Sequence, residues 1–242
     1  MLVWAAAVTA TALVLSGCEV RRRAAPVGVG FLRVAEVVRA TDRAALSPLA
    51  WSPDGRRFAY GGRDGVWIHR LGDAAGAKIA TGEAVTAVAW SAATDTLAYV
   101  DRGVLWTIRP DGQNHRKIPI QGVVSRPVWA PGGDRLAVAV QPAGQGAVGA
   151  QVWWTSPDGT MIRQILWDSR GKRIGALGWF PDALYLFVGL VAADGDATVE
   201  WWKVRIAYPD FRRLADPPRP GLHPVLSPSG EWIAFVASET GT

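Results

Sequence analysis

The chain has 242 residues, of which 49% are hydrophobic, and it carries a formal charge of +5. This length and hydrophobic content are sufficient for one folded domain with a large core. A positive charge is typical of nucleic-acid-binding proteins, but the Lys and Arg residues are scattered along the chain and match no DNA- or RNA-binding motif. We therefore exclude nucleic acid as a partner.

Residues 1–18 have the pattern of a secretory signal segment. Leu2 to Leu15 is apolar apart from two threonines, and small residues precede Cys18. The stretch Leu15-Ser16-Gly17-Cys18 resembles the lipobox of bacterial lipoproteins, which implies that Cys18 is lipidated and becomes the first residue of the mature chain. Cys18 is the only cysteine, which excludes a disulfide framework and a cysteine metal site. The alternative is an uncleaved anchor helix with an incidental cysteine.

Residues 19–44 are expected to be a tether that contains one possible strand. Arg21-Arg22-Arg23 would lie beside anionic headgroups after lipidation and contribute about 1 kcal/mol per Arg. No Lys or Arg precedes the apolar run, which suggests that this start lies inside a longer signal sequence. Positive charge after an uncleaved helix would instead favour a cytoplasmic orientation of that flank.

A short cassette recurs along residues 45–242 at intervals of about 40–50 residues, and such a period indicates a repeat architecture. Each copy has an aromatic residue or Leu, then a small residue or Phe, and in most copies Pro followed by Asp or Gly. The copies begin at Trp51, Trp90, Trp129, Trp179 and Leu226.

Four short strands are predicted for each repeat, because apolar runs alternate with Gly, Pro and Asp clusters and no helical period competes. A four-stranded unit of this size cannot bury both of its faces alone. Radial stacking of such units buries them, which predicts an all-β fold, a β-propeller of four-stranded antiparallel blades. Most of the 13 Trp residues fall at equivalent repeat positions, so core packing is favoured over a sugar-stacking platform.

The Pro, Asp and Gly residues of the cassettes predict structural hairpin turns. Pro presets φ, Asp bonds its own backbone, and Gly supplies positive φ. We expect the carboxylates of Asp54, Asp134 and Asp182 to brace turns. A phosphate or metal loop is the disfavoured alternative, because the motif recurs between strands.

Trp51-Ser52-Pro53-Asp54-Gly55 followed by an apolar strand resembles the WD-repeat-like β-propeller repeats of TolB and its relatives. The resemblance covers residues 45–242 and implies a platform for protein or ligand contacts. It supplies no catalytic residue that could be carried over to this chain.

Four repeats are complete, at residues 46–82, 84–122, 124–170 and 173–218, and a fifth begins at Leu222 with only two strands before Thr242. Two explanations stay open. Val27 to Val38 could complete the last blade, or the chain is a fragment of a larger propeller, for which the resemblance implies six blades. Truncation is narrowly favoured, because open sheet edges invite aggregation.

Residues able to do chemistry are few. His69 and His115 are expected on the solvated surface, and His223 opens an innermost strand from which it could reach a central channel. No His pair has metal-ligand spacing, and no Gly-x-Ser-x-Gly nucleophile motif is present. Asp194-Gly195-Asp196 resembles part of a calcium loop but lacks the later Glu. We therefore expect no enzyme activity, no cofactor and no metal.

The sequence thus predicts a bacterial envelope lipoprotein that acts as a non-enzymatic binding platform. Its expected partners are another envelope protein or a small ligand, and the loops Gln141–Gly149 and Val191–Thr198 are the candidate contact sites. Ligand sensing in the central channel is a further possibility. The alternative is the propeller module of a prolyl-oligopeptidase-like peptidase whose catalytic domain is missing from this chain.

Overall fold

The computed structural model describes residues 14–16, 19–21, 45, 47–143, 149, 151–165, 171–192, 199–207, 210–214 and 221–237. Every regular element in these residues is a β-strand. The chain divides into two compact units, Leu32–Gly171 and the paired segments Met1–Phe31 and Lys172–Thr242.

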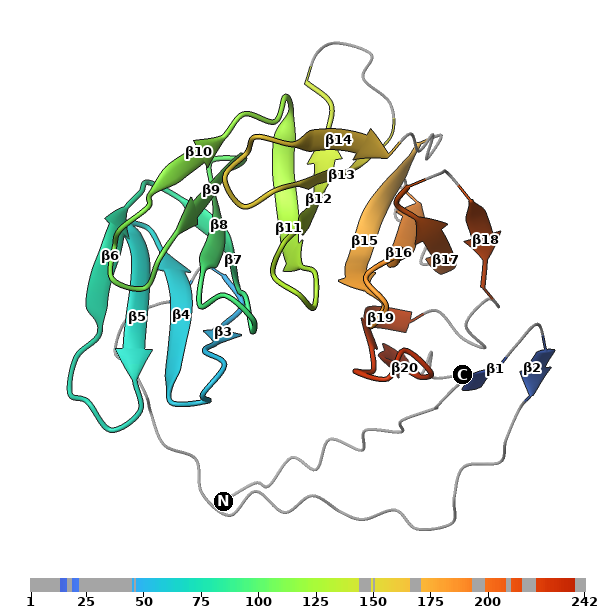
Figure 1. Ribbon diagram of the computed structural model, residues 1–242, viewed down its shortest axis with the longest axis horizontal. Helices are drawn as coiled ribbons and strands as arrows, with labels where there is room; N and C mark the ends of the chain where they lie inside the picture. The colour runs from blue at the N-terminus through green and yellow to red at the C-terminus, as the bar shows by residue number, and fades with distance from the viewer. Residues whose placement is uncertain are drawn as a thin grey trace, which may run out of the picture. The chain divides into compact units, whose positions relative to one another are not determined.

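The unit Leu32–Gly171 contains three four-stranded antiparallel sheets, which we call blades 1, 2 and 3 (Figure 1). Within each blade the strands follow one another in chain order, so each blade is a simple meander. Blade 1 consists of β3 (Ala50–Trp51), β4 (Arg57–Gly62), β5 (Gly65–Arg70) and β6 (Ala77–Thr81). Blade 2 consists of β7 (Val85–Trp90), β8 (Leu97–Asp101), β9 (Val104–Ile108) and β10 (Arg116–Ile118). Blade 3 consists of β11 (Val123–Trp129), β12 (Leu136–Gln141), β13 (Gln151–Thr155) and β14 (Ile162–Ile165).

The other unit contains blade 4, with the same meander, and a two-stranded sheet that we call blade 5. Blade 4 consists of β15 (Lys172–Trp179), β16 (Tyr185–Ala192), β17 (Val199–Arg205) and β18 (Phe211–Arg213). Blade 5 consists of β19 (Gly221–Leu226) and β20 (Ile233–Ala237). A separate hairpin pairs β1 (Val14–Ser16) with β2 (Glu19–Arg21).

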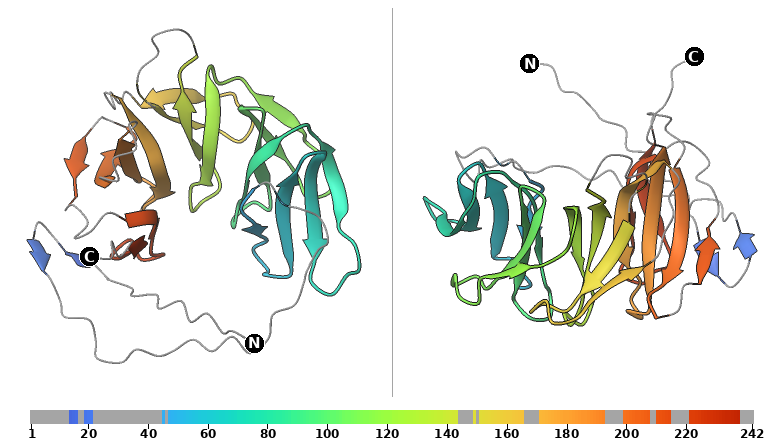
Figure 2. Two further views of the ribbon diagram at one scale, coloured as in Figure 1. Left: turned by 180° about the vertical axis from the view of Figure 1, so that it is seen from behind. Right: turned by 90° about the horizontal axis from the view of Figure 1, so that it is seen from above.

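The second strand of each blade in the Leu32–Gly171 unit is a continuous buried run. In β8 the residues from Leu97 to Val100 are at most 1% exposed. Successive residues of a strand point to opposite faces, so burial of the whole run means that both faces of blade 2 are covered. One face joins a cluster with Ala59 and Ile68 of blade 1, and the other joins a cluster with Val138 of blade 3. Figure 2 shows these three sheets standing side by side.

The first strands of blades 2 to 5 all contain a β-bulge, where the register with the second strand shifts. In β11 the shift lies between Ser125 and Val128 and includes Arg126, whose φ is +50°, and Pro127. Pro is tolerated inside a sheet at such a place, because a bulged residue makes no ladder hydrogen bond. The bulge therefore explains how a strand-breaking residue fits within β11.

These sheets confirm the predicted all-β propeller of four-stranded antiparallel blades, with a fifth blade of which the structure describes two strands. In the described residues no helix is long and apolar enough to cross a membrane.

The tryptophans follow the core-packing prediction only in part. Trp67, Trp90 and Trp201 are buried, but Trp51 of β3 is 52% exposed. Its ring contacts Phe58 edge to face at 5.6 Å. Trp90 holds the equivalent position in blade 2 and is buried because it belongs to the core cluster that blades 1 and 2 share, a cluster that does not include Trp51.

Candidate functional site

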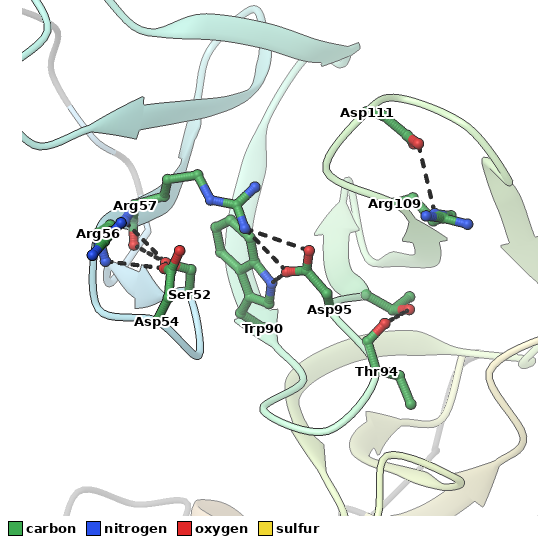
Figure 3. A network of polar contacts seen from close by, with 10 residues as sticks. Ser52, Asp54, Arg56, Arg57, Trp90, Thr94, Asp95, Arg109 and Asp111 are labelled. Carbon is green, nitrogen blue, oxygen red and sulfur yellow. Dashed lines mark hydrogen bonds and ion pairs between the residues drawn. The ribbon is translucent and has the colours of Figure 1, made fainter.

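The Ser-Pro-Asp-Gly turn of blade 1 is closed by its own side chains (Figure 3). The Ser52 hydroxyl donates to Asp54 Oδ1 at 2.5 Å, and the Arg56 backbone N–H donates to the same oxygen at 3.0 Å. These two hydrogen bonds, that from Ser52 first, lower the pKa of Asp54 below its ordinary value. Asp54 therefore braces the turn, as the sequence predicts.

Blade 3 contains the same four-residue sequence in a different hairpin, between β13 and β14. The Ser156 hydroxyl donates to Asp158 Oδ1 at 2.5 Å, and the backbone N–H and hydroxyl of Thr160 donate to that oxygen at 3.1 and 2.8 Å. Together these hydrogen bonds lower the pKa of Asp158 to about 2. The turn forms between β3 and β4 and again between β13 and β14, so its geometry follows from the local sequence and not from its position in the blade.

The other two cassette carboxylates behave differently from each other. Asp182 Oδ1 accepts the Leu184 backbone N–H at 2.9 Å, which confirms the predicted brace. Asp134 instead accepts the side-chain Nε–H of Arg135 at 2.9 Å, so its expected role is corrected. In that cassette Gly132 stands at the place of Asp54, and Asp134 comes two positions later, beyond the turn.

A polar clasp joins the cassettes of blades 1 and 2 (Figure 3). The Arg57 guanidinium lies over the Trp90 indole, 5.1 Å from the ring centroid, and 3.4 Å from the Asp95 carboxylate. The Trp90 indole N–H donates to that same carboxylate at 2.7 Å. The charges of Arg57 and Asp95 compensate each other and the indole N–H is satisfied, which makes the clasp a structural element of the blade interface.

His69 is not on the surface as expected, but is 3% exposed within β5. Its imidazole stacks on Phe58 at 5.3 Å, and Nε2 donates to the Asp73 carbonyl at 3.0 Å. Side chains alternate between the two faces of β5, and that of His69 points to a buried face. The sequence places His69 near the end of a strand but does not show which face it occupies. His69 Nδ1 is buried and has no hydrogen-bond partner among the described residues.

His115 is exposed, as predicted, but it is not simply solvated. Its Nε2 hydrogen-bonds the Tyr99 hydroxyl at 2.5 Å, and its ring lies 4.9 Å from the Trp106 ring. Partial burial lowers the pKa of His115, and burial followed by the charge of Asp101 raises the pKa of Tyr99. The register of β8 and β9 pairs Tyr99 with Trp106. The His115 ring joins them from the loop before β10, and only the folded structure shows this contact.

The remaining sequence-predicted positions lie outside the described residues or side chains. Cys18, Asp194 and Asp196 are outside them, as are most of the two candidate contact loops. His223 is placed in β19 by its backbone alone. Among the side chains that the structure places, no group of three or more His, Cys, Asp and Glu could hold a metal ion.

The third strand of each complete blade carries a Trp that sequence analysis assigned to the core, and three of these indoles belong to polar clusters. Trp67 donates its N–H to Asp64 at 3.0 Å, Trp153 to Gln151 at 3.0 Å and Trp202 to Glu200 at 3.2 Å. In the sequence, each acceptor stands two or three residues before its Trp. Whether the two side chains meet depends on the strand register, which the sequence does not show.

Comparison with known proteins was made at the levels of sequence and structure. No family model and no curated protein matches this chain. A structure assigned as TolB from Agrobacterium tumefaciens matches with a TM-score of 0.64 and 17% identity, over 80% of this chain and 70% of that chain. Hydrazine synthase from Kuenenia stuttgartiensis matches with a TM-score of 0.60 and 14% identity, over 78% of this chain and 60% of that chain.

The fold is a TolB-like β-propeller. This result confirms the resemblance that the cassettes suggested. At such identities the likeness establishes the fold only, so the function of this TolB-like propeller must be sought in its own residues.

Proposed function

We propose that the chain is a non-enzymatic, lipid-anchored propeller of the bacterial cell envelope that binds another protein or a small ligand. The observation that carries the proposal is the TolB-like propeller fold, a scaffold on which exposed loops and strand ends provide contacts.

The polar groups of the described blades support a binding role over catalysis. The carboxylates of Asp54, Asp95, Asp158 and Glu200 are each held by hydrogen bonds or ion pairs within a turn, a clasp or a blade. Hydrogen bonding lowers the pKa of Asp54, Asp158 and Glu200, whereas a general acid needs a raised pKa. These groups therefore stabilise the fold and are poorly suited to proton transfer.

Lipid attachment at Cys18 rests on the sequence Leu15-Ser16-Gly17-Cys18. Expression of the full chain in a bacterium with labelled palmitate should give a labelled, membrane-bound protein. The variant Cys18→Ser should lose the label and leave the membrane fraction. Equal membrane binding and equal labelling of both proteins would contradict the anchor.

The binding role is tested by crosslinking the tagged chain in intact membranes. We expect one partner or ligand to be recovered in stoichiometric amount, and to be lost when residues 193–198 are replaced by a Gly-Ser segment of equal length. A Gly-Ser replacement of residues 73–75, in a turn of blade 1, should leave recovery unchanged. Recovery of nothing above background, or turnover of peptide substrates by the purified chain, would overturn the proposal.

A further inference from the structure

The four complete blades serve as internal controls for one position, the Trp of the third strand. Register places Trp67, Trp106, Trp153 and Trp202 directly opposite a residue of the fourth strand, and these residues are respectively Lys78, Lys117, Gln164 and Arg213. Side chains at directly opposed positions lie on the same face of a sheet. Each blade therefore presents an indole and one outer residue side by side.

In blades 1 and 4 the chain supplies a carboxylate to this pair. Asp64 accepts the Trp67 indole N–H at 3.0 Å and lies 2.7 Å from Lys78 Nζ. Glu200 accepts the Trp202 indole N–H at 3.2 Å and lies 3.7 Å from the Arg213 guanidinium. One carboxylate thus satisfies an indole donor and a cation together, and it is assisted in blade 4 by Lys172 at 2.6 Å.

Blade 3 shows the same arrangement without charge. The Trp153 indole N–H donates to the amide oxygen of Gln151 at 3.0 Å, and the opposed outer residue is Gln164. The acid and the cation are both replaced by neutral residues here. Across blades 1, 3 and 4, the acceptor is therefore an anion where the outer residue is a cation, and it is neutral where the outer residue is neutral.

Blade 2 breaks this rule. Trp106 stands opposite Lys117, but the acceptor positions two and three residues before the indole are Val104 and Gly103. Lys117 is exposed, and within the described part of the chain no ion pair or cation–π contact involves it. A cation and an indole donor thus share a face without the carboxylate that accompanies them in blades 1 and 4.

The nearest acid along this strand pair does not replace the missing acceptor. Asp101 stands opposite Val104, and its Oδ1 accepts the backbone N–H groups of Glu83 and Ala84 at 3.1 and 2.8 Å. The His115 ring, 4.9 Å from the Trp106 ring, is fixed by its hydrogen bond to the Tyr99 hydroxyl. This ring adds an aromatic wall to the position.

We propose that blade 2 binds a carboxylate supplied by a partner, with Lys117 as the cation and the Trp106 indole N–H as the second donor. The inference rests on the proposed binding function and names the chemistry of its ligand. Lysine on an outermost strand also discourages edge-to-edge pairing of sheets. Edge protection explains the presence of Lys117, but it does not explain why the acceptor is missing in this blade alone.

The source of the carboxylate is either an acidic side chain of a protein or a small organic acid. The experiment uses two probes, a fluorescein-labelled Gly-Ser peptide with three Glu residues, followed by fluorescence anisotropy, and succinate as a competitor. Binding of the peptide at low salt with weak competition by succinate would assign the site to a protein partner. Full competition by succinate at concentrations similar to those of the unlabelled peptide would assign it to a small acid.

Three variants decide whether the site is the one described. Lys117→Gln should weaken peptide binding about fivefold to tenfold, as expected for a lost charge-assisted contact. Val104→Glu copies the position of Glu200 and should block binding similarly, because the chain then supplies its own carboxylate. Lys78→Gln is the matched control, since Lys78 already pairs with Asp64, and it should change binding less than twofold, within the range of screened surface charge effects.

Equal weakening by Lys78→Gln and Lys117→Gln would overturn the proposal, because it would show attraction to net charge alone. Unchanged binding in Val104→Glu, with a melting temperature equal to that of the wild type, would also overturn it. A partner captured from membranes regardless of these variants would leave the binding function standing and remove this site. Peptide binding that depends on Lys117, without any captured partner, would support the site and remove the broader function.

Discussion

The Arg57 guanidinium of blade 1 lies 5.1 Å from the ring centroid of Trp90 in blade 2, and both side chains contact the Asp95 carboxylate. Two blades are therefore joined by one cation, one ring and one acid, and the contributions of the three can be separated by mutation.

Trp90→Ala should destabilise the protein far more than Arg57→Ala. Trp90 is 9% exposed and belongs to the core between blades 1 and 2, so its loss should cost about 3–5 kcal/mol. The Arg57 and Asp95 side chains are 31% and 51% exposed, and such a pair contributes at most about 1 kcal/mol. Urea unfolding of the two variants measures the difference, and equal midpoints would contradict the assignment of Trp90 to the core.

Asp158 should make stability depend on pH in the acidic range. Its pKa in the folded protein is about 2, below the ordinary 3.8, so folding favours the ionised form. The stabilisation is complete above the unfolded value and is lost as pH falls through about 2. Melting curves between these limits should show a wild-type advantage over Asp158→Asn that shrinks with decreasing pH.

Ser156→Ala provides the control for that result. Removal of the hydroxyl takes away the largest cause of the shift, so the pKa of Asp158 should rise toward its ordinary value. NMR titration of the carboxyl carbon would measure this change directly. An unaltered titration curve would show that Ser156 does not hold this carboxylate.

Two glycines with positive φ should respond very differently to Ala. Gly65 has φ +139°, and an added Cβ would lie 1.9 Å from the Ala80 carbonyl oxygen, so Gly65→Ala must displace β6. Gly55 has φ +65° and open space around the added carbon, so Gly55→Ala should cost only about 1 kcal/mol of backbone strain. Thermal melting should rank Gly65→Ala well below Gly55→Ala, and the reverse order would refute the close approach of β5 and β6.

Thr107→Val should weaken the contact between blades 2 and 3. The Thr107 hydroxyl is buried and donates to the Pro157 carbonyl at 2.9 Å. Val has nearly the same shape but leaves this carbonyl without its donor, at a cost of about 1–3 kcal/mol. Thr96→Val, at an exposed turn hydroxyl, should change the free energy of unfolding by less than about 0.5 kcal/mol. Similar losses in both variants would argue against a specific bond between the blades.

The sequence by itself determined the strands, the turns and the repeat. Apolar runs such as Leu97–Val100 and turns such as Ser52–Gly55 are encoded by neighbours within a few residues, and short-range chemistry is sufficient to form them. The same turn at Ser156–Gly159, in another hairpin, shows how little it depends on the surrounding fold.

The tertiary structure decided which side chains meet across strands and blades. It buried His69 and placed Lys117 opposite an indole that lacks a carboxylate. These outcomes depend on strand register and on the face that an alternating chain presents. Packing of whole sheets sets both, and residues far apart in the chain supply that packing.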